Sequence, residues 1–240
     1  MKENYLNKKK YKDLGRWYIN NFVLEVAKRV EHGCRILDVG AGECVYKQLF
    51  DHLHYESIDL GIGDNTWDFT ENTYTAPLDN MPILSNSYDA VLCTQVIEHL
   101  KLPKESISEM YRVLKPGGVL YLTAPMCQGE HQQPHDYFRY TSFGIAYLCK
   151  DAGFSEVRVT PFGGLLIKWA YELPMLLNLL PNSNITSRNC SIKISGLFFI
   201  PIKLCLIFLI SIFQRVLFFL SRFDNSKDYP FGWSCIAKKI

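Results

Sequence analysis

The stretch Arg35–Glu43, RILDVGAGE, most constrains how this chain can fold. Its apolar residues predict a buried strand that runs into two glycines, Gly40 and Gly42. Glycine adopts positive φ without strain and lets backbone N–H groups approach a ligand closely. Asp38 interrupts the apolar run, and its carboxylate needs a hydrogen-bond partner if the strand is buried. Because open α/β sheets bind ligands at the carboxyl ends of their strands, we expect a ligand at this turn.

Two common nucleotide-binding motifs are absent from this sequence, which limits the class of ligand. We expect the ligand to be a nucleoside. A dinucleotide-binding turn has a third glycine where this chain has Val45, and the lysine and Ser/Thr of a phosphate-binding P-loop are absent. A second predicted strand, Tyr55–Asp59, ends in another acidic residue. The alternative interpretation is an ordinary strand-to-helix turn with a capping glycine.

Hydrophobic periodicity predicts alternating helices and strands along most of the chain. Helices are expected over 14–30, 45–53, 104–114 and 141–152, and strands over 36–39, 55–59, 88–93, 119–125, 154–160 and 231–237. The segment 61–87 is rich in Gly, Asn, Thr, Asp and Pro, and we expect it to wrap the ligand instead of packing into a core. The predicted domains are an N-terminal helical segment (1–30), an α/β core (31–163), an apolar helical insertion (164–225) and a final core strand (226–240).

The middle of the chain resembles the class I S-adenosylmethionine-dependent methyltransferases. The motifs that carry the resemblance are D-x-G-x-G, the acid that ends the second strand, and SYDAVLCTQVIEHL followed by a helix and YRVLKPGGVLYLTAP. The resemblance covers about residues 30–160 and is close to the UbiE/UbiG-like group of small-molecule methyltransferases, which carry LEH after the fourth strand. It implies a doubly wound, Rossmann-like, seven-stranded α/β sheet, here with an apolar helical insertion before the last strand.

The resemblance also implies S-adenosylmethionine as the cofactor and a set of residues that hold it. Its methionine part would lie at Asp38, Gly40 and Gly42, and its ribose at Asp59. The transferred methyl would lie above Thr94 and Gln95. The group carries an Asp at the adenine where this chain has Pro77. The adenine contact is therefore expected from Asp79, from Asp68 or from backbone.

A polar, aromatic loop after the fifth predicted strand supplies the candidate catalytic residues. His135 is the candidate general base, with His131 as the reserve, because an imidazole titrates near working pH. Arg139 and Tyr137 are expected to orient an anionic or sugar acceptor, since PHDYFRYT resembles a segment of methyltransferases from bacterial surface-polysaccharide clusters. The alternative is a hydrogen-bonded loop in which Arg139 pairs with Asp136. No metal is predicted, because the two histidines lack an obvious third ligand.

The predicted insertion is the most apolar part of the chain. A helix is expected over 165–180, broken at Pro174, and a second apolar segment runs over 196–223. Its uncharged core, 204–213, is shorter than the ~20 residues that a spanning helix needs. We expect a peripheral membrane contact or a lid over a hydrophobic substrate, with a homodimer interface or a core helix as the alternative.

Composition excludes some partners and compartments. The formal net charge of +2 gives no reason to expect nucleic acid as a partner. Eight scattered cysteines without a C-x-x-C pair indicate reduced thiols, and the N-terminus lacks an apolar signal region. A cytoplasmic protein is expected, peripheral at the inner face of the membrane.

The predicted function is methyl transfer from S-adenosylmethionine to an oxygen or nitrogen of a small-molecule, sugar or lipid-linked acceptor. A quinone-type lipid is the nearest rival acceptor. Two other classes stay open at this point: a catalytically silent, cofactor-binding scaffold subunit of a membrane-bound biosynthetic complex, and a membrane-tethered structural protein without cofactor.

Overall fold

The computed structural model describes residues 13–63, 66–180 and 199–240. The chain forms two compact units, each considered by itself. Of the described residues, the first unit contains Arg16–Phe162 and Phe231–Ile240, and the second contains 13–15 and Gly163–Pro230. Part of the predicted insertion, residues 181–198, lies outside the described residues.

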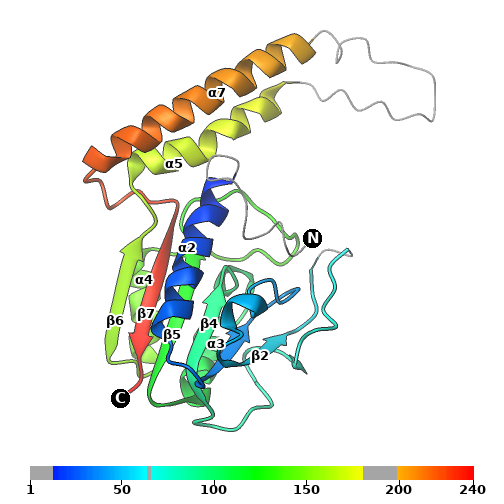
Figure 1. Ribbon diagram of the computed structural model, residues 1–240, viewed down its shortest axis with the longest axis vertical. Coiled ribbons are helices and arrows are strands. Elements are labelled where there is room, and N and C mark those ends of the chain that lie inside the picture. Colours follow the sequence, from blue (N-terminus) through cyan, green and yellow to red (C-terminus); the bar gives the residue numbers. More distant parts are fainter. Residues whose placement is uncertain (1–12, 64–65, 181–198) are drawn as a thin grey trace, which may run out of the picture. The chain divides into compact units, whose positions relative to one another are not determined.

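The first unit is built around one mixed sheet (Figure 1). Its elements are α2 (Leu14–Arg29), β1 (Arg35–Val39), η1 (Lys47–Phe50), β2 (His54–Asp59), β3 (Tyr74–Thr75), β4 (Tyr88–Thr94), η2 (Ile97–His99), α3 (Pro103–Val113), β5 (Leu114–Pro125), α4 (Ser142–Asp151), β6 (Glu156–Pro161) and β7 (Gly232–Lys238). The seven strands lie in the order β3-β2-β1-β4-β5-β7-β6. Only β7 runs antiparallel to its neighbours, and it pairs with β5 and β6. The predicted seven-stranded α/β sheet is therefore confirmed.

The parallel register brings the chemistry to one edge of the sheet. β1 lies between β2 and β4, with Asp38 opposite Ser57 and Leu92. The carboxyl ends of β1, β2, β4 and β5 therefore meet at the same edge, where the chain leaves each strand in a loop.

Helices cover both faces of the sheet because strand residues alternate in direction. Leu37 and Val39 of β1 belong to a core cluster with Ile107 of α3 and Ile145 of α4. On the other face α2 packs through aromatic contacts, including Phe22 against Tyr121 of β5.

The predicted helix over 45–53 is wrong, and a short 3-10 helix, η1, replaces it. Cys44, directly before this segment, has a φ of +52°, so no right-handed helix can run into the segment from the glycine turn. Its sulfur lies 3.4 Å from Ser57 Oγ, so the left-handed residue is held against β2. The chain therefore passes from the glycine turn to η1 through successive turns.

The prediction that 61–87 does not pack into a core is also wrong in part. β3 pairs with β2, and the side chains of Leu78 and Met81 are buried in the main core. Met81 N donates to Glu109 Oε2 of α3 at 2.8 Å, which fixes this end of the segment. Residues before β3 stay exposed at the carboxyl edge of the sheet.

The second unit consists of apolar helices: α5 (Leu165–Glu172), η3 (Leu173–Leu179), α7 (Ile200–Leu220) and η4 (Ser221–Phe223). The predicted break near Pro174 is confirmed, because Pro174 stands in the first turn of η3. α5 and α7 pack on each other, and the buried Gln214 donates to Ala170 O at 2.8 Å.

Candidate functional site

The glycine turn after β1 depends on both of its glycines. Gly40 and Gly42 have φ values of +69° and +54°. A Cβ on Gly40 would lie 2.4 Å from a methyl carbon of Val96, so only glycine lets the turn pass under the loop after β4. Gly40 N donates to Ile58 O at 2.8 Å, which ties the turn to β2.

Asp59, at the end of β2, faces this turn. Its Oδ2 accepts a hydrogen bond from Gly42 N and its Oδ1 accepts one from Gly61 N, both at 2.8 Å. A carboxylate offers about four acceptor positions, so two remain for hydroxyl donors. The side chain is only partly buried. Asp59 therefore combines a fixed position with free acceptor capacity, as a residue that binds ribose hydroxyls requires.

Asp38 supports the turn from inside the protein. It is 2% exposed, and Tyr55 Oη donates to its Oδ2 at 2.7 Å. Burial raises the pKa of Asp38 to about 7, although the hydrogen bond from Tyr55 opposes that shift. The Tyr55 hydroxyl is thus the hydrogen-bond partner that a buried Asp38 carboxylate needs. Contact of Asp38 with a ligand stays a prediction.

Substitution of Asp38 by asparagine should flatten the pH dependence of stability. Because the folded-state pKa is raised, the folded protein binds this proton more tightly than the unfolded chain. The stabilising contribution is complete below the unfolded pKa of about 4 and is lost as pH rises to about 7, with a slope approaching 1.4 kcal/mol per pH unit. Urea denaturation at about pH 5 and about pH 7 measures the difference between wild type and Asp38→Asn. Parallel pH profiles of the two proteins would contradict the assignment.

Two further predicted cofactor residues, Thr94 and Gln95, lie at the same edge. Thr94 ends β4, and Gln95 follows it with a φ of +55°. Gln95 donates to Thr123 Oγ1 of β5 through both its backbone N, at 3.2 Å, and its Nε2, at 3.1 Å. Asp79 is exposed in the loop after β3, and its adenine contact stays a prediction.

Trp67 covers the glycine turn and was missed from the sequence. A Cβ on Gly42 would lie 3.8 Å from its ring, and its neighbour Asp68 donates through its backbone N to Glu43 Oε1 at 3.3 Å. The only available signal was an aromatic residue in the segment after β2.

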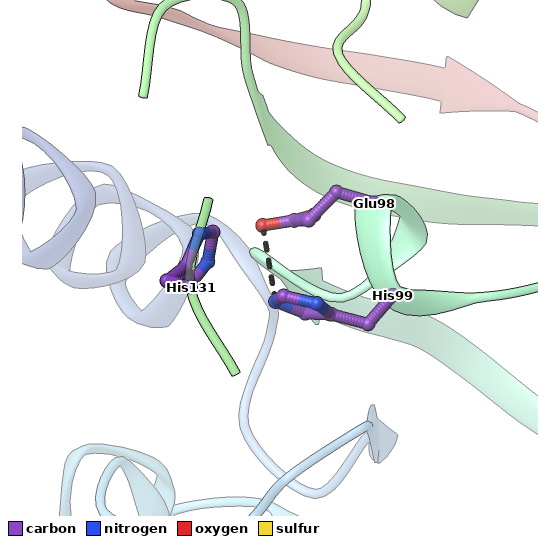
Figure 2. Close-up of side chains that lie close together, drawn as sticks. All are labelled: Glu98, His99 and His131. Atoms are coloured by element: carbon purple, nitrogen blue, oxygen red, sulfur yellow. Dashed lines mark ion pairs between the residues drawn. The ribbon is translucent and has the colours of Figure 1, made fainter. Parts of the chain in front are cut away.

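A second group of polar side chains lies just beyond the end of β4. Glu98 and His99 of η2 and His131 of the loop after β5 each offer one ligand atom, and these three atoms lie within 4.8 Å of one another (Figure 2). Glu98 is completely buried, with neither carboxylate oxygen in a hydrogen bond among the described residues. Burial raises the pKa of Glu98 to about 8 and lowers the pKa of His99.

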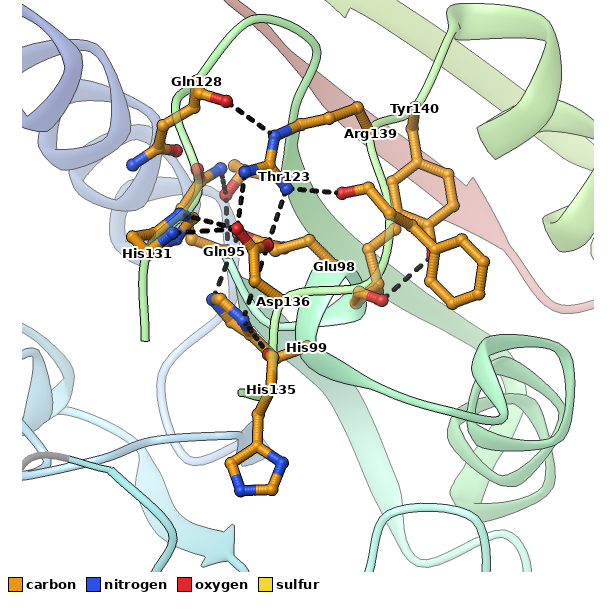
Figure 3. A network of polar contacts seen from close by, with 12 residues as sticks. Gln95, Glu98, His99, Thr123, Gln128, His131, His135, Asp136, Arg139 and Tyr140 are labelled. Atoms are coloured by element: carbon orange, nitrogen blue, oxygen red, sulfur yellow. Dashed lines mark hydrogen bonds and ion pairs between the residues drawn. The ribbon is translucent and has the colours of Figure 1, made fainter. Parts of the chain in front are cut away.

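Backbone hydrogen bonds hold the loop after β5 against η2 and so create this group. Glu98 O accepts from the backbone N of Tyr137 at 2.9 Å and of Phe138 at 3.2 Å. His99 Nδ1 lies 2.6 Å from His135 O, and Tyr140 Oη donates to Ile97 O at 2.9 Å (Figure 3). Residues more than thirty positions apart in sequence are therefore held as one unit.

Arg139 and Asp136 form the internal brace of this loop. Arg139 donates to both carboxylate oxygens of Asp136 at 2.7 Å and to the carbonyl oxygens of Gln128, Gly129 and Phe138 (Figure 3). The Arg139 guanidinium holds the pKa of Asp136 well below its usual range. All five guanidinium donors are used, as the alternative interpretation of this loop predicted. This arrangement argues against a direct contact between Arg139 and an acceptor.

The two candidate bases, His131 and His135, have different surroundings. His131 joins Glu98 and His99, whereas the His135 ring points away from them and meets Tyr137 Oη at 3.2 Å (Figure 3). His135 takes part in the group through its backbone carbonyl. Tyr137 is exposed. The catalytic roles of His131, His135 and Tyr137 stay predictions.

Sequence reasoning gave no role to Glu98 and His99, although both stood in a quoted motif. The signal was present: an acid and an imidazole directly after a buried strand, at the edge where ligands bind. Their juxtaposition with His131 depends on the fold of the loop, which the sequence does not show.

Comparison with known proteins identifies the fold. The methyltransferase domain family matches residues 37–122. A protein of Mycolicibacterium smegmatis named "Probable S-adenosylmethionine-dependent methyltransferase" is 31% identical over 109 residues. That alignment covers 42% of this chain and 42% of the relative, so the chain matches well under half the length of this curated relative.

Solved structures share the architecture at low identity. A SAM-dependent methyltransferase from Archaeoglobus fulgidus matches with a TM-score of 0.55 and 15% identity, covering 91% of this chain and 94% of that one. The Haemonchus contortus phosphoethanolamine N-methyltransferase 2, solved with S-adenosylhomocysteine, matches with a TM-score of 0.53 and 18% identity, covering 100% of this chain and 60% of that one. The fold is that of the S-adenosylmethionine-dependent methyltransferases.

Proposed function

We propose that this chain is an S-adenosylmethionine-dependent methyltransferase that acts on an oxygen or nitrogen of a small-molecule, sugar or lipid-linked acceptor. The observation that carries the proposal is the turn after β1, where two positive-φ glycines face the Asp59 carboxylate with acceptor capacity to spare. S-adenosylmethionine is the cofactor and supplies a methyl group already activated on its sulfonium. The matched methyltransferase domain, residues 37–122, contains this turn.

The residues of the chain then have mainly binding and positioning roles. Gly40 and Gly42 form the floor under the methionine part, Asp59 binds the ribose hydroxyls, and Thr94 and Gln95 close the site at the end of β4. Holding the acceptor and the methyl in line accounts for much of the rate of such a transfer. We keep His135 as the predicted acceptor of the proton from an acceptor hydroxyl, with His131 as the reserve.

Calorimetric titration with S-adenosylmethionine and S-adenosylhomocysteine tests the proposal. Micromolar binding of both is expected, followed by transfer of a labelled methyl group into lipid-linked saccharide or quinone extracts. The resemblance to the UbiE/UbiG-like group and to polysaccharide-cluster enzymes sets the order in which acceptors are tried. A folded protein that binds neither compound would rule out the enzyme and leave a scaffold.

We further propose that α7 makes a peripheral contact with the inner face of the cytoplasmic membrane. α7 with η4, Ile200–Phe223, is long and apolar enough to cross a membrane, and 17% of its most apolar stretch is buried. Its exposed apolar residues include Leu204, Phe208, Phe213 and Phe219. A 21-residue helix is about 31 Å long, and Lys203 and Arg215 are the charged residues of α7, so lipid is the occupant that fits its uncovered apolar sides.

Acidic substitutions on α7 should weaken membrane binding strongly. The double variant Leu204→Asp/Phe208→Asp places two charges on exposed positions and should lower vesicle binding at least about tenfold, since each charge in apolar surroundings costs ~3 kcal/mol. Flotation with mixed phosphatidylcholine and phosphatidylglycerol vesicles measures the bound fraction.

Phe143→Asp is the matched control, because Phe143 of α4 is 85% exposed and lies outside the second unit. It should float like wild type. A wild-type protein that stays at the bottom of the gradient and sediments as a dimer, with the dimer broken by the α7 variant, would replace lipid with a second copy of the chain.

A further inference from the structure

The starting observation is a pair of buried acceptors that face each other with no donor between them. Glu98 Oε1 lies 3.8 Å from His99 Nε2, and neither atom forms a hydrogen bond among residues 13–63, 66–180 and 199–240 (Figure 2). The Glu98 side chain is 0% exposed and that of His99 is 13% exposed. Buried polar atoms without partners are costly, and in native proteins they call for an explanation such as an ion.

The tautomer of His99 follows from its other nitrogen. His99 Nδ1 lies 2.6 Å from the carbonyl oxygen of His135, and a carbonyl can only accept, so Nδ1 carries the proton. His99 Nε2 therefore presents a lone pair to the Glu98 carboxylate. Two lone-pair groups at this distance repel each other unless a cation or a proton lies between them, and at 3.8 Å they are too far apart to share a proton in a hydrogen bond.

His131 completes the group in the same way. Its Nδ1 lies 3.1 Å from Gly129 O, which places the proton on Nδ1 and the lone pair on Nε2. Histidines that bind metals almost always donate their other ring N–H to a carbonyl or carboxylate, and both imidazoles here already do so. The arrangement is thus oriented for a ligand that only accepts lone pairs.

We infer that Glu98, His99 and His131 bind one divalent first-row transition metal ion, with Zn²⁺ as the reference ion. Two imidazoles and a carboxylate are a common donor set for Zn²⁺ and for non-haem iron. Ligand atoms on one such ion lie about 3.5 Å apart, so the observed spread of up to 4.8 Å requires an inward shift of about 1 Å. His131 is the ligand that can move, because its side chain is 27% exposed.

Three protein ligands leave a coordination position open, which is the arrangement of catalytic and not structural metal sites. If the proposed methyltransferase function holds, that position would take an acceptor oxygen and favour its ionised form. Binding of the ion itself depends only on the three side chains. An experiment can therefore disprove metal binding without disproving methyl transfer, and the reverse.

The test is metal binding by full-length protein without a histidine tag and without cofactor or acceptor. After chelation, wild type should take up one equivalent of Zn²⁺ by elemental analysis. Co²⁺ should give the visible absorption of a low-symmetry site, and its titration gives the affinity. Glu98→Gln keeps the shape of the side chain but removes the charge, and should weaken Co²⁺ binding about 100-fold or more, since even outer partners of a ligand are worth 10–100-fold.

His135→Ala is the matched control, because its ring lies outside the group and its backbone carbonyl is kept (Figure 3). It should bind Co²⁺ like wild type, whereas His131→Asn should bind at least tenfold more weakly. Zn²⁺ should also raise the thermal midpoint of wild type by several degrees and leave that of Glu98→Gln unchanged, which checks the result independently of absorption. Uptake of less than a tenth of an equivalent of Zn²⁺ by wild type would overturn the inference. So would a Co²⁺ affinity of Glu98→Gln equal to that of wild type.

Discussion

Asp59→Ala is expected to weaken binding of S-adenosylmethionine by about 10³-fold. The carboxylate would accept from both ribose hydroxyls, and hydrogen bonds to a charged group contribute about 1.5–3 kcal/mol each. Their joint loss corresponds to about 10²–10⁴ in the dissociation constant. The same substitution releases Gly42 N and Gly61 N, so the turn loses its anchor to β2. Calorimetric titration of both cofactor forms measures the effect.

Two further variants separate ligand contacts from support of the turn. Asp59→Asn keeps an acceptor for one backbone N–H but loses the charge, and should lie between wild type and Asp59→Ala. Asp51→Ala removes an exposed carboxylate before the amino end of β2 and should bind like wild type. If Asp59→Ala melts like wild type and still binds with undiminished affinity, Asp59 does not hold the ribose.

Gly40→Ala is expected to lower the free energy of unfolding by about 2–5 kcal/mol, although it adds only one methyl group. A side chain at φ +69° carries a left-handed penalty of about 1–2 kcal/mol, and overpacking against Val96 adds about 1–3 kcal/mol. For a chain of this size the thermal midpoint should fall by about 10 °C. Thermal melting without cofactor measures the loss of stability. Melting with cofactor shows whether the variant still binds it.

Gly33→Ala measures the part of the stability loss that comes from the left-handed backbone alone. Gly33 has a φ of +78° but nothing within 4 Å of an added Cβ, so its variant should lose only about 1–2 kcal/mol. The double variant Gly40→Ala/Val96→Ala should recover part of the packing loss, which a double-mutant cycle quantifies. Equal losses at Gly33 and Gly40 would mean that Val96 moves aside without cost.

The sequence predicted the strands well because burial imposes a strong pattern. The strand expected over 88–93 is observed as β4, Tyr88–Thr94, and the strands expected over 154–160 and 231–237 are observed as β6 and β7. β3 escaped notice because a two-residue strand has no periodicity. The helix expected over 45–53 failed because a short 3-10 helix buries Phe50 as well as an α-helix would, so apolar spacing does not distinguish the two.

The candidate site was predictable only where it follows a strand end. Asp59 and Gly42 were placed correctly at the carboxyl edge of the sheet because strand ends converge there. The group of Glu98, His99 and His131 was not, because it requires the loop after β5 to fold back onto η2. Backbone hydrogen bonds to Glu98 O create that fold, and backbone contacts leave no trace in residue types.

The position of β7 has a consequence for the order in which the protein is made. β7 lies between β5 and β6, yet it is synthesised after the whole second unit. The ribosome therefore releases α7 while the sheet still lacks its next-to-last strand and β6 has no neighbour to pair with. The apolar helix meets its surroundings before the α/β unit can close. A contact between α7 and another surface can therefore form before the cofactor-binding sheet is complete.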